Sequence, residues 1–235
     1  MTAEAGRDHG QETRQRILRA ATRIFAELGF HQTTVREICQ SAEVNVAAIN
    51  YHFRDKEGLY LEVLRAAHAR ANRVAPLQPE GVDKATAEDR LRGFVRAICA
   101  RIFDVGPDAC HGQLMSHEMV RPTRALDEIV ETEIRPKAML LMGIIREIVG
   151  PEPPDEAVRA VCYSIIGQCL FYKNCRPVVE RLMPENVPTP EDMEAIAEHI
   201  VEFSLHGIRG LTKKKECWWQ RCIGRAEHRR KASGS

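Results

Sequence analysis

One stretch of the sequence, residues 33–56, constrains the fold more than any other, because it combines two short helical patterns with a tight turn. Its apolar residues recur at helical spacing on both sides of the turn, so one face of each helix can be buried; they are Val35, Ile38, Cys39, Ala42, Val44, Ile49 and Phe53. The other faces carry hydroxyl, guanidinium, amide, phenol and imidazole groups, which bind phosphate oxygens and base edges. The stretch therefore predicts a DNA-binding helix-turn-helix.

The same residues carry a family resemblance. Thr33-Thr34, Val44, Asn50-Tyr51-His52-Phe53 and Lys56-Glu57-Gly58-Leu59 resemble the helix-turn-helix of the TetR family of bacterial transcriptional repressors, over residues 11–71. One departure is Glu43, since the family usually has glycine just before the turn valine. If the backbone there needs a positive φ, a residue other than glycine adds strain of about 1 kcal/mol.

The residues that we expect to contact DNA lie on the second and third helices of this motif and at the start of the fourth. The hydroxyl of Thr34, at a helix N-terminus, suits a phosphate, and arginine is the most common reader of guanine. The resemblance implies a base contact for Arg36 and phosphate contacts for Tyr51, His52 and Lys56. The full set is Thr34, Arg36, Asn45, Val46, Ala47, Ala48, Asn50, Tyr51, His52 and Lys56. An ordinary surface arginine at 36, or a buried structural role for Tyr51 or His52, is the alternative.

The helices of the N-terminal part can be placed from their start and stop signals. We expect a disordered leader at residues 1–10, then a first helix over residues 12–28 that Gly29 terminates. A capping box of Thr34 and Glu37 starts the second helix. The third and fourth are expected over residues 46–53 and 56–74.

The remainder of the chain shows helical patterns throughout and no alternating strand pattern. After a loop marked by Pro76, Pro79 and Gly81, helices are expected over residues 85–105 and 109–120. A long helix then opens at Pro122 and is kinked or divided by Pro136; two more follow over residues 155–175 and 190–207. We therefore predict an all-α chain with a three-helix DNA-binding head (11–71), a helical ligand-binding and dimerisation body (76–211) and a basic tail (212–235).

Charge is distributed unevenly along the chain. Residues 1–75 carry a net charge of +2, residues 76–211 carry −7, and residues 212–235 carry +6. Because an acidic body is repelled by DNA, only the head and the tail can face a duplex. The tail, with Trp218 and Trp219, is interpreted as a disordered extension; contact with nucleic acid or a membrane surface is the alternative.

The body carries a second resemblance. Three segments of the body, together with Asn45-Val46-Ala47-Ala48-Ile49-Asn50-Tyr51-His52-Phe53 of the head, are similar to the CecR-related subgroup, which is associated with transport and drug-sensitivity genes. The body segments are Pro122-Thr123-Arg124-Ala125-Leu126-Asp127, Arg135-Pro136 and Gly167-Gln168-Cys169-Leu170-Phe171-Tyr172. In the family, the two late helices pair with their copies in a homodimer. The resemblance implies an interface at Val158, Cys162, Ile165, Cys169, Ile196, Ile200 and Phe203. Burial of these residues inside the monomer is the alternative.

An inducer pocket is expected between the middle helices, where apolar walls with a few polar groups suit a small molecule. Its candidates are Phe103, Met115, His117, Glu118, Arg121, Tyr163, Gln168 and Tyr172. Each of these is alternatively an ordinary packing or surface residue.

Other chemistries find weaker support in the sequence. Cys110 and His111 with His117 and Glu118 match no familiar zinc spacing, so no metal or other cofactor is predicted. Cys162, Cys169 and Cys175 lie at near-helical spacing and leave a redox sensor open. We find no grouping of nucleophile, base and orienting residue for an enzyme.

The absence of a signal core or a long apolar run favours the cytoplasm over a membrane. The function expected is a homodimeric repressor that a small molecule releases from a pseudo-palindromic DNA operator. A DNA-binding scaffold without a ligand, a redox- or metal-sensing regulator and a helical enzyme are the alternatives.

Overall fold

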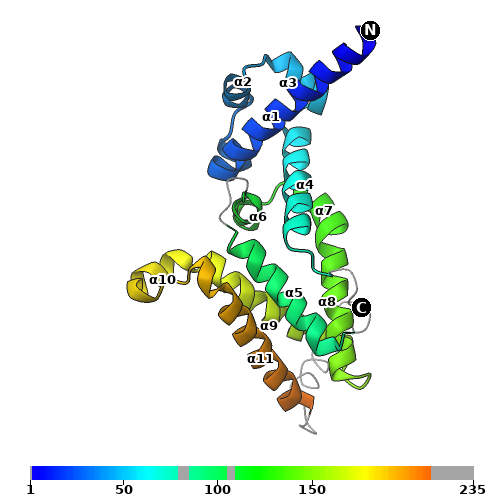
Figure 1. Cartoon of the computed structure of the whole chain (residues 1–235), viewed down its shortest axis with the longest axis vertical. Coiled ribbons are helices and arrows are strands. Elements are labelled where there is room, and N and C mark those ends of the chain that lie inside the picture. The colour runs from blue at the N-terminus through cyan, green and yellow to red at the C-terminus, as the bar shows by residue number, and fades with distance from the viewer. Residues whose placement is uncertain (1, 79–84, 105–108, 213–235) are drawn as a thin grey trace, which may run out of the picture. The chain divides into compact units, whose positions relative to one another are not determined.

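The computed structural model describes residues 2–78, 85–104 and 109–212, and it separates into two units (Figure 1). The head unit consists of Met1–Val74 and Val105–Ile134, and the body unit of Ala75–Asp104 and Arg135–Ser235. Every regular element in the described ranges is helical, which confirms the all-α prediction. Pro79, Gly81 and the basic tail beyond Thr212 lie outside the described residues.

The head unit contains more of the chain than the predicted head at residues 11–71. Its helices are α1 (Thr2–Gln32), α2 (Val35–Ala42), α3 (Val46–Phe53), α4 (Lys56–Val74), α6 (His111–Val120) and α7 (Arg124–Ile129), followed by the π-helical turn η2 (Val130–Ile134). Leu114 and Ile129 belong to the same buried cluster as Phe25, Ile49 and Tyr60. Because α6 and α7 bury their apolar faces against α1 and α4, residues 109–134 join the head.

The first helix begins earlier than expected. The sequence predicted a disordered leader and a start near residue 12, whereas α1 begins at Thr2 and includes Gly10. Its predicted end is confirmed, since Gly29 breaks the helix with φ 73° and ψ 170°. The Thr33 hydroxyl donates a hydrogen bond of 2.8 Å to the Gly29 carbonyl. Gly29 therefore turns the chain from α1 towards α2.

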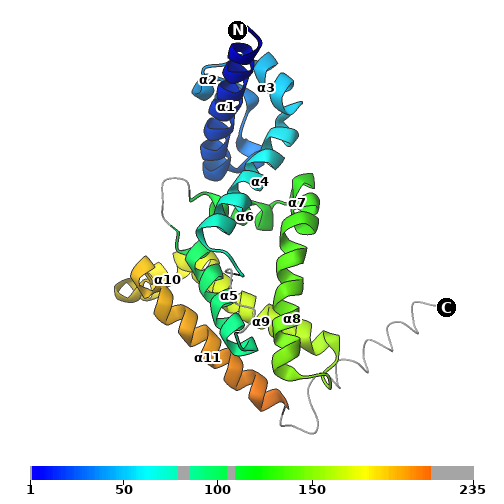
Figure 2. The same ribbon diagram turned by 45° about the vertical axis from the view of Figure 1, so that its right-hand side comes forward.

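The body unit is arranged around α5 (Ala87–Ile102), which packs against α8 (Arg135–Val149), α9 (Asp155–Asn174) and α11 (Met193–Thr212) (Figure 2). Between α9 and α11 the chain forms α10 (Arg176–Leu182) and the short turns η3 (Pro184–Asn186) and η4 (Pro190–Asp192). Leu91, Phe94 and Val95 of α5 are buried in the core. The predicted last helix ended near Gly207, but α11 continues to Thr212.

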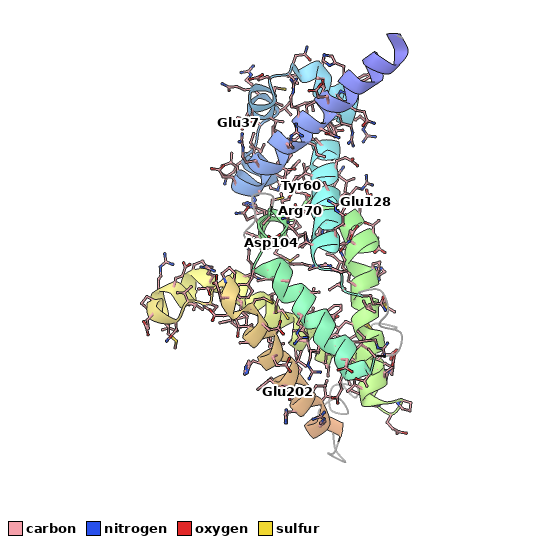
Figure 3. The ribbon with its side chains drawn as sticks, viewed as in Figure 1. Glu37, Tyr60, Arg70, Asp104, Glu128 and Glu202 are labelled. Atoms are coloured by element: carbon pink, nitrogen blue, oxygen red, sulfur yellow. The ribbon has the colours of Figure 1, made fainter. Side chains whose placement is uncertain are left out.

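Charged side chains on α5 also connect it to α11. Arg92 lies 3.1 Å from Glu198 and 3.2 Å from Glu202, and Arg96 lies 2.5 Å from Glu194; Glu202 is labelled on α11 in Figure 3. These pairs are partly exposed, so each contributes less than about 1 kcal/mol. The apolar core supplies most of the stability of the unit.

Pro136 divides the long helix that the sequence predicted. Proline has no N–H to donate to the carbonyl four residues earlier, and its ring clashes with that carbonyl. The chain widens into η2 over Val130–Ile134 and returns to regular geometry in α8. The helix also begins two residues later than expected, at Arg124 rather than at Pro122.

Candidate DNA-binding surface

The start of α2 is fixed by the capping box that the sequence predicted. The Glu37 amide donates to the Thr34 hydroxyl at 3.2 Å, and the Glu37 carboxylate accepts from the Thr34 amide at 2.7 Å and from its hydroxyl at 2.8 Å. These bonds hold the pKa of Glu37 below its usual value. Because the Thr34 hydroxyl already donates to Glu37, it must exchange this partner to bind a phosphate.

The turn between α2 and α3 requires a positive φ at Glu43. This residue adopts the left-handed conformation, with φ 51° and ψ 50°. The amide that follows it, from Val44, donates to the Cys39 carbonyl at 3.0 Å. The turn therefore keeps its hydrogen bonds but holds a side chain where the family usually has glycine.

Replacing Glu43 with glycine is expected to raise the free energy of unfolding. The substitution removes left-handed strain of roughly 1–2 kcal/mol but adds chain entropy to the unfolded state, so we expect a net gain of up to about 1 kcal/mol. Urea denaturation measures this gain. Glu43→Ala is the matched control, because it removes the carboxylate but keeps Cβ; an equal gain in both variants would assign the effect to charge.

The start of α3 depends on Asn45. Its side-chain oxygen accepts a hydrogen bond of 3.0 Å from the Ala48 amide. The sequence analysis expected Asn45 to contact DNA, but the structure engages its side-chain oxygen in the helix cap. Only the side-chain NH₂ group of Asn45 remains available to DNA.

The outer face of the motif exposes most of the predicted DNA contacts. Arg36, Asn45, Val46, Ala47, Asn50 and Tyr51 are exposed, with Tyr51 at 85%, whereas Ile49 and Phe53 are buried. Ala48 is half-buried against the head core, so it offers less surface to a base than predicted. His52 is also half-buried, and its ring lies 4.9 Å from that of Tyr51. Arg36 forms no ion pair or hydrogen bond within the described part of the chain.

Lys56 is positioned at the start of α4 by two neighbours. Its Nζ atom lies 4.3 Å from the centre of the Phe30 ring. Partial burial lowers the pKa of Lys56, and the negative charge of Glu37 opposes that change. The charged end of Lys56 is therefore held close to the N-terminus of α2, where Glu37 is labelled in Figure 3.

Arg54 is a candidate that the sequence analysis missed. It follows α3 directly, with φ 73° and ψ −50°, and its side chain is 91% exposed. Its guanidinium lies 3.5 Å from the Asp55 carboxylate. A strained backbone that presents an exposed cation directly after α3 is a signal that only the structure supplies.

The predicted inducer residues fall into both units. Met115, His117, Glu118 and Arg121 lie on or next to α6 in the head unit, while Phe103, Tyr163, Gln168 and Tyr172 lie in the body unit. In the body, the rings of Phe103 and Tyr172 are 6.2 Å apart, and Gln168 donates to the Ser204 hydroxyl at 3.3 Å. Tyr163 is 72% exposed on α9.

Two of these residues are instead used inside the head unit. Glu118 is only 1% exposed and accepts hydrogen bonds from the Tyr60 hydroxyl at 2.8 Å and the Thr123 amide at 2.9 Å. His117 contacts the Ala26 carbonyl through Nε2 at 3.1 Å. Both side chains hold α6 against α1 and α4, so the contacts favour a structural role over ligand binding for Glu118 and His117.

The sequence left open a metal or redox sensor built from cysteine and histidine side chains. Among the described residues, no group of three or more His, Cys, Asp or Glu side chains is arranged to hold a metal ion. Burial raises the pKa of Cys162 to about 11. Because the thiolate is the reactive form, this environment disfavours Cys162 as a redox sensor.

The structure places most of the residues of the predicted dimer interface in the interior of the body unit. Val158, Cys162, Ile165, Cys169 and Ile200 are buried in the core of their own body unit, and Ile196 packs partly against it. The five buried side chains have little surface left for contact with a second copy. Of the predicted set, only Phe203 is largely exposed, at 64%.

Comparison with known proteins gives matches in both units. Residues 87–208 match the family described as the C-terminal domain of the HTH-type transcriptional dual regulator CecR, and residues 17–63 match "Bacterial regulatory proteins, tetR family". CecR of Shigella flexneri is 28% identical over 175 residues, covering 70% of this chain and 77% of that protein.

Two further proteins are similar. The HTH-type transcriptional regulator HbdR of Aromatoleum sp. (strain CIB) is 29% identical over 159 residues, which cover 67% of each chain. The solved structure of AibR, in complex with isovaleryl coenzyme A and operator DNA, has a TM-score of 0.59 at 17% identity and covers 81% of this chain and 97% of its own. The AibR likeness supports the helical fold.

Proposed function

Because this chain belongs to the TetR family of bacterial regulatory proteins and has a CecR-type C-terminal domain, we propose that it is a homodimeric repressor of transcription. A small-molecule inducer releases it from a pseudo-palindromic operator in the cytoplasm, and it has no catalytic role. The observation that carries the proposal is the capped α2–α3 motif, which turns its polar side chains outward from a buried apolar core. We propose that it controls genes of transport or drug sensitivity, as the resemblance of its body motifs to the CecR-related subgroup implies.

In this proposal α3 enters the major groove. Its exposed Val46 and Ala47 contact thymine methyl groups, while Arg36 and Asn50 read base edges. Contacts to the phosphate backbone on either side come from Thr34, Tyr51, His52, Arg54 and Lys56.

In the described chain no helix is both long and apolar enough to cross a membrane.

The second copy binds the outward faces of α9 and α11 rather than the predicted buried stripe. These faces expose Tyr163 and Phe171 of α9 and Phe203 of α11, at 72%, 50% and 64%. Large exposed apolar groups in one region mark interaction surfaces. A twofold dimer through this face presents two heads to half-sites about one helical turn apart.

Release by an inducer follows if the ligand binds one arrangement of the dimer more tightly than the other. The ligand changes operator affinity only by that difference in binding free energy. A DNA-binding scaffold that takes no ligand would keep the same operator affinity whichever metabolite is added.

The test of this function begins with selection of DNA. Purified protein is incubated with a random duplex library, bound sequences are recovered, and affinity for the selected site is measured by fluorescence anisotropy at several salt concentrations. We expect an inverted repeat and a steep loss of affinity with salt, because cationic contacts release counterions. Recovery of no common sequence from a correctly folded protein would reject the proposed function.

Two substitutions separate base recognition from phosphate contact. Arg36→Ala is expected to lose roughly 1–3 kcal/mol of discrimination at one base pair, since it removes a base contact. Lys56→Ala is expected to weaken all sequences equally and to lower the salt slope by about 1. Affinities for the selected site and its single-base variants measure both effects. Unchanged discrimination in Arg36→Ala would remove this residue from the reading surface.

A further inference from the structure

The head unit contains a cavity that neither the predicted DNA contacts nor the predicted inducer residues line. Its volume is about 230 Å³. The walls come from the end of α1, the first turns of α4 and the start of α7, and they consist of Phe30, His31, Glu57, Tyr60, Pro122, Thr123, Arg124 and Ala125. Sites for drug-sized ligands measure roughly 300–1,000 Å³, so this cavity accepts only a smaller molecule.

One side of the cavity is apolar and held in place. The rings of Phe30 and Tyr60 lie 5.0 Å apart at 45°, with Pro122 and Ala125 also in the wall. Tyr60 is fully buried, and its hydroxyl donates to Glu118 (Figure 3 labels Tyr60 on α4). A wall that is already ordered costs a ligand little conformational entropy on binding.

The Glu118 carboxylate also orders the part of the wall that Thr123 forms. It accepts from the Thr123 amide at 2.9 Å and from the Thr123 hydroxyl at 3.1 Å. The connection from α6 to α7 is thereby tied to α4 through one buried carboxylate. Thr123 and its neighbour Arg124 therefore have defined positions at the cavity.

Two opposite charges lie on this cavity without partners. Glu57 and Arg124 are both exposed, and within the described residues neither side chain forms an ion pair or a hydrogen bond. An anion alone is attracted by Arg124 and repelled by Glu57, and the reverse holds for a cation. A ligand with both charges next to an apolar group complements all three features.

From these observations we infer that the cavity is a binding site for a free α-amino acid with an apolar side chain. Its carboxylate pairs with the Arg124 guanidinium, and its ammonium group pairs with the Glu57 carboxylate. Its side chain packs between Phe30 and Pro122. The occupant joins α1, α4 and α7, so it stabilises the head unit by an amount that rises with the logarithm of its concentration once that concentration exceeds the dissociation constant.

The experiment measures binding of L-phenylalanine and L-leucine to the full chain by isothermal titration calorimetry. The comparison compounds are 3-phenylpropionate, which lacks the ammonium group, and phenethylamine, which lacks the carboxylate. We expect at least one of the two amino acids to bind, and each comparison compound to bind at least tenfold more weakly than L-phenylalanine. The titrations contain no DNA, so this inference and the proposed function can fail separately.

Variants test the two charges. Arg124→Gln and Glu57→Gln are each expected to weaken amino-acid binding at least tenfold. Arg121→Gln is the matched control, because Arg121 is an exposed arginine of the same connection that does not line the cavity. All three side chains are exposed, and circular dichroism verifies that each variant keeps its helices.

Three results would overturn the inference. The first is that neither amino acid binds the native chain. The second is that binding is unchanged in Arg124→Gln and Glu57→Gln. The third is that inorganic phosphate displaces the amino acid completely and that the Glu57→Gln variant binds phosphate more tightly than the native chain does. This result would make the cavity a simple anion site.

Discussion

Replacing Phe203 with aspartate is expected to convert the protein from a dimer to a monomer and to lower operator affinity roughly 100-fold or more. The Phe203 side chain is 64% exposed on α11, so the folded monomer tolerates the change. A charge at the centre of an apolar interface lacks a partner and loses its hydration when the copies meet. Without the dimer, each head binds its half-site alone, and the gain of roughly 10²–10⁴ from linked binding is lost.

Met139→Asp is the control for this substitution. Met139 is also a large apolar side chain of the body unit, 59% exposed, but it lies on α8. The Met139→Asp variant is expected to keep the molecular mass of the dimer in solution and the operator affinity of the native chain. Light scattering gives the mass, and fluorescence anisotropy on the selected inverted repeat gives the affinity. If Phe203→Asp remains a dimer at micromolar concentration, the outward face of α9 and α11 is not the interface.

The interface shows where sequence periodicity reaches its limit. Helix α9 carries one apolar stripe through Val158, Cys162, Ile165 and Cys169 and a second apolar surface through Tyr163 and Phe171. Periodicity detects the first stripe but does not say whether it faces the core of its own chain or a partner. The sequence interpretation assigned the first stripe to the partner, and the structure places it in the body core.

Local signals were more reliable than long-range ones. The capping box at Thr34, the helix α3 over Val46–Phe53 and the break at Gly29 all depend on neighbouring residues, and the structure confirms each of them. The TetR resemblance of the same stretch is confirmed by the family match.

Contacts between distant parts of the chain could not be predicted. Glu118 lies 58 residues from Tyr60 in sequence, yet the two share a hydrogen bond. For this reason α6 was assigned to the ligand-binding body, although its buried face belongs to the head core. The unpartnered charges at Glu57 and Arg124 were missed for the same reason, since only folding brings both to one cavity.

Gly29→Ala is expected to lower the free energy of unfolding by roughly 2–4 kcal/mol. With φ 73° and ψ 170°, Gly29 has a backbone conformation that is essentially restricted to glycine, so an L-residue adds strain of about 1–3 kcal/mol, offset by about 0.4–1 kcal/mol of unfolded-chain entropy. The new methyl group would lie 2.8 Å from Nδ1 of His117, closer than van der Waals contact allows. Displacing that ring adds an overpacking cost of roughly 1–3 kcal/mol, because its Nε2 is held against the Ala26 carbonyl. Urea denaturation followed by circular dichroism measures the loss.

Two other glycines separate these causes. Gly150 has φ 78° with open space where Cβ would lie, so Gly150→Ala adds backbone strain without a contact and, after the offset from unfolded-chain entropy, is expected to cost up to about 1 kcal/mol. Gly93 lies inside α5 with the same open space, and Gly93→Ala is expected to stabilise by about 0.5–1 kcal/mol. In the double variant Gly29→Ala with His117→Ala, the contact with the ring is gone and only the strain at φ 73° remains. The cost of Gly29→Ala in the His117→Ala background should therefore fall by the overpacking cost of roughly 1–3 kcal/mol, and an undiminished cost would show that His117 does not limit the space at Gly29.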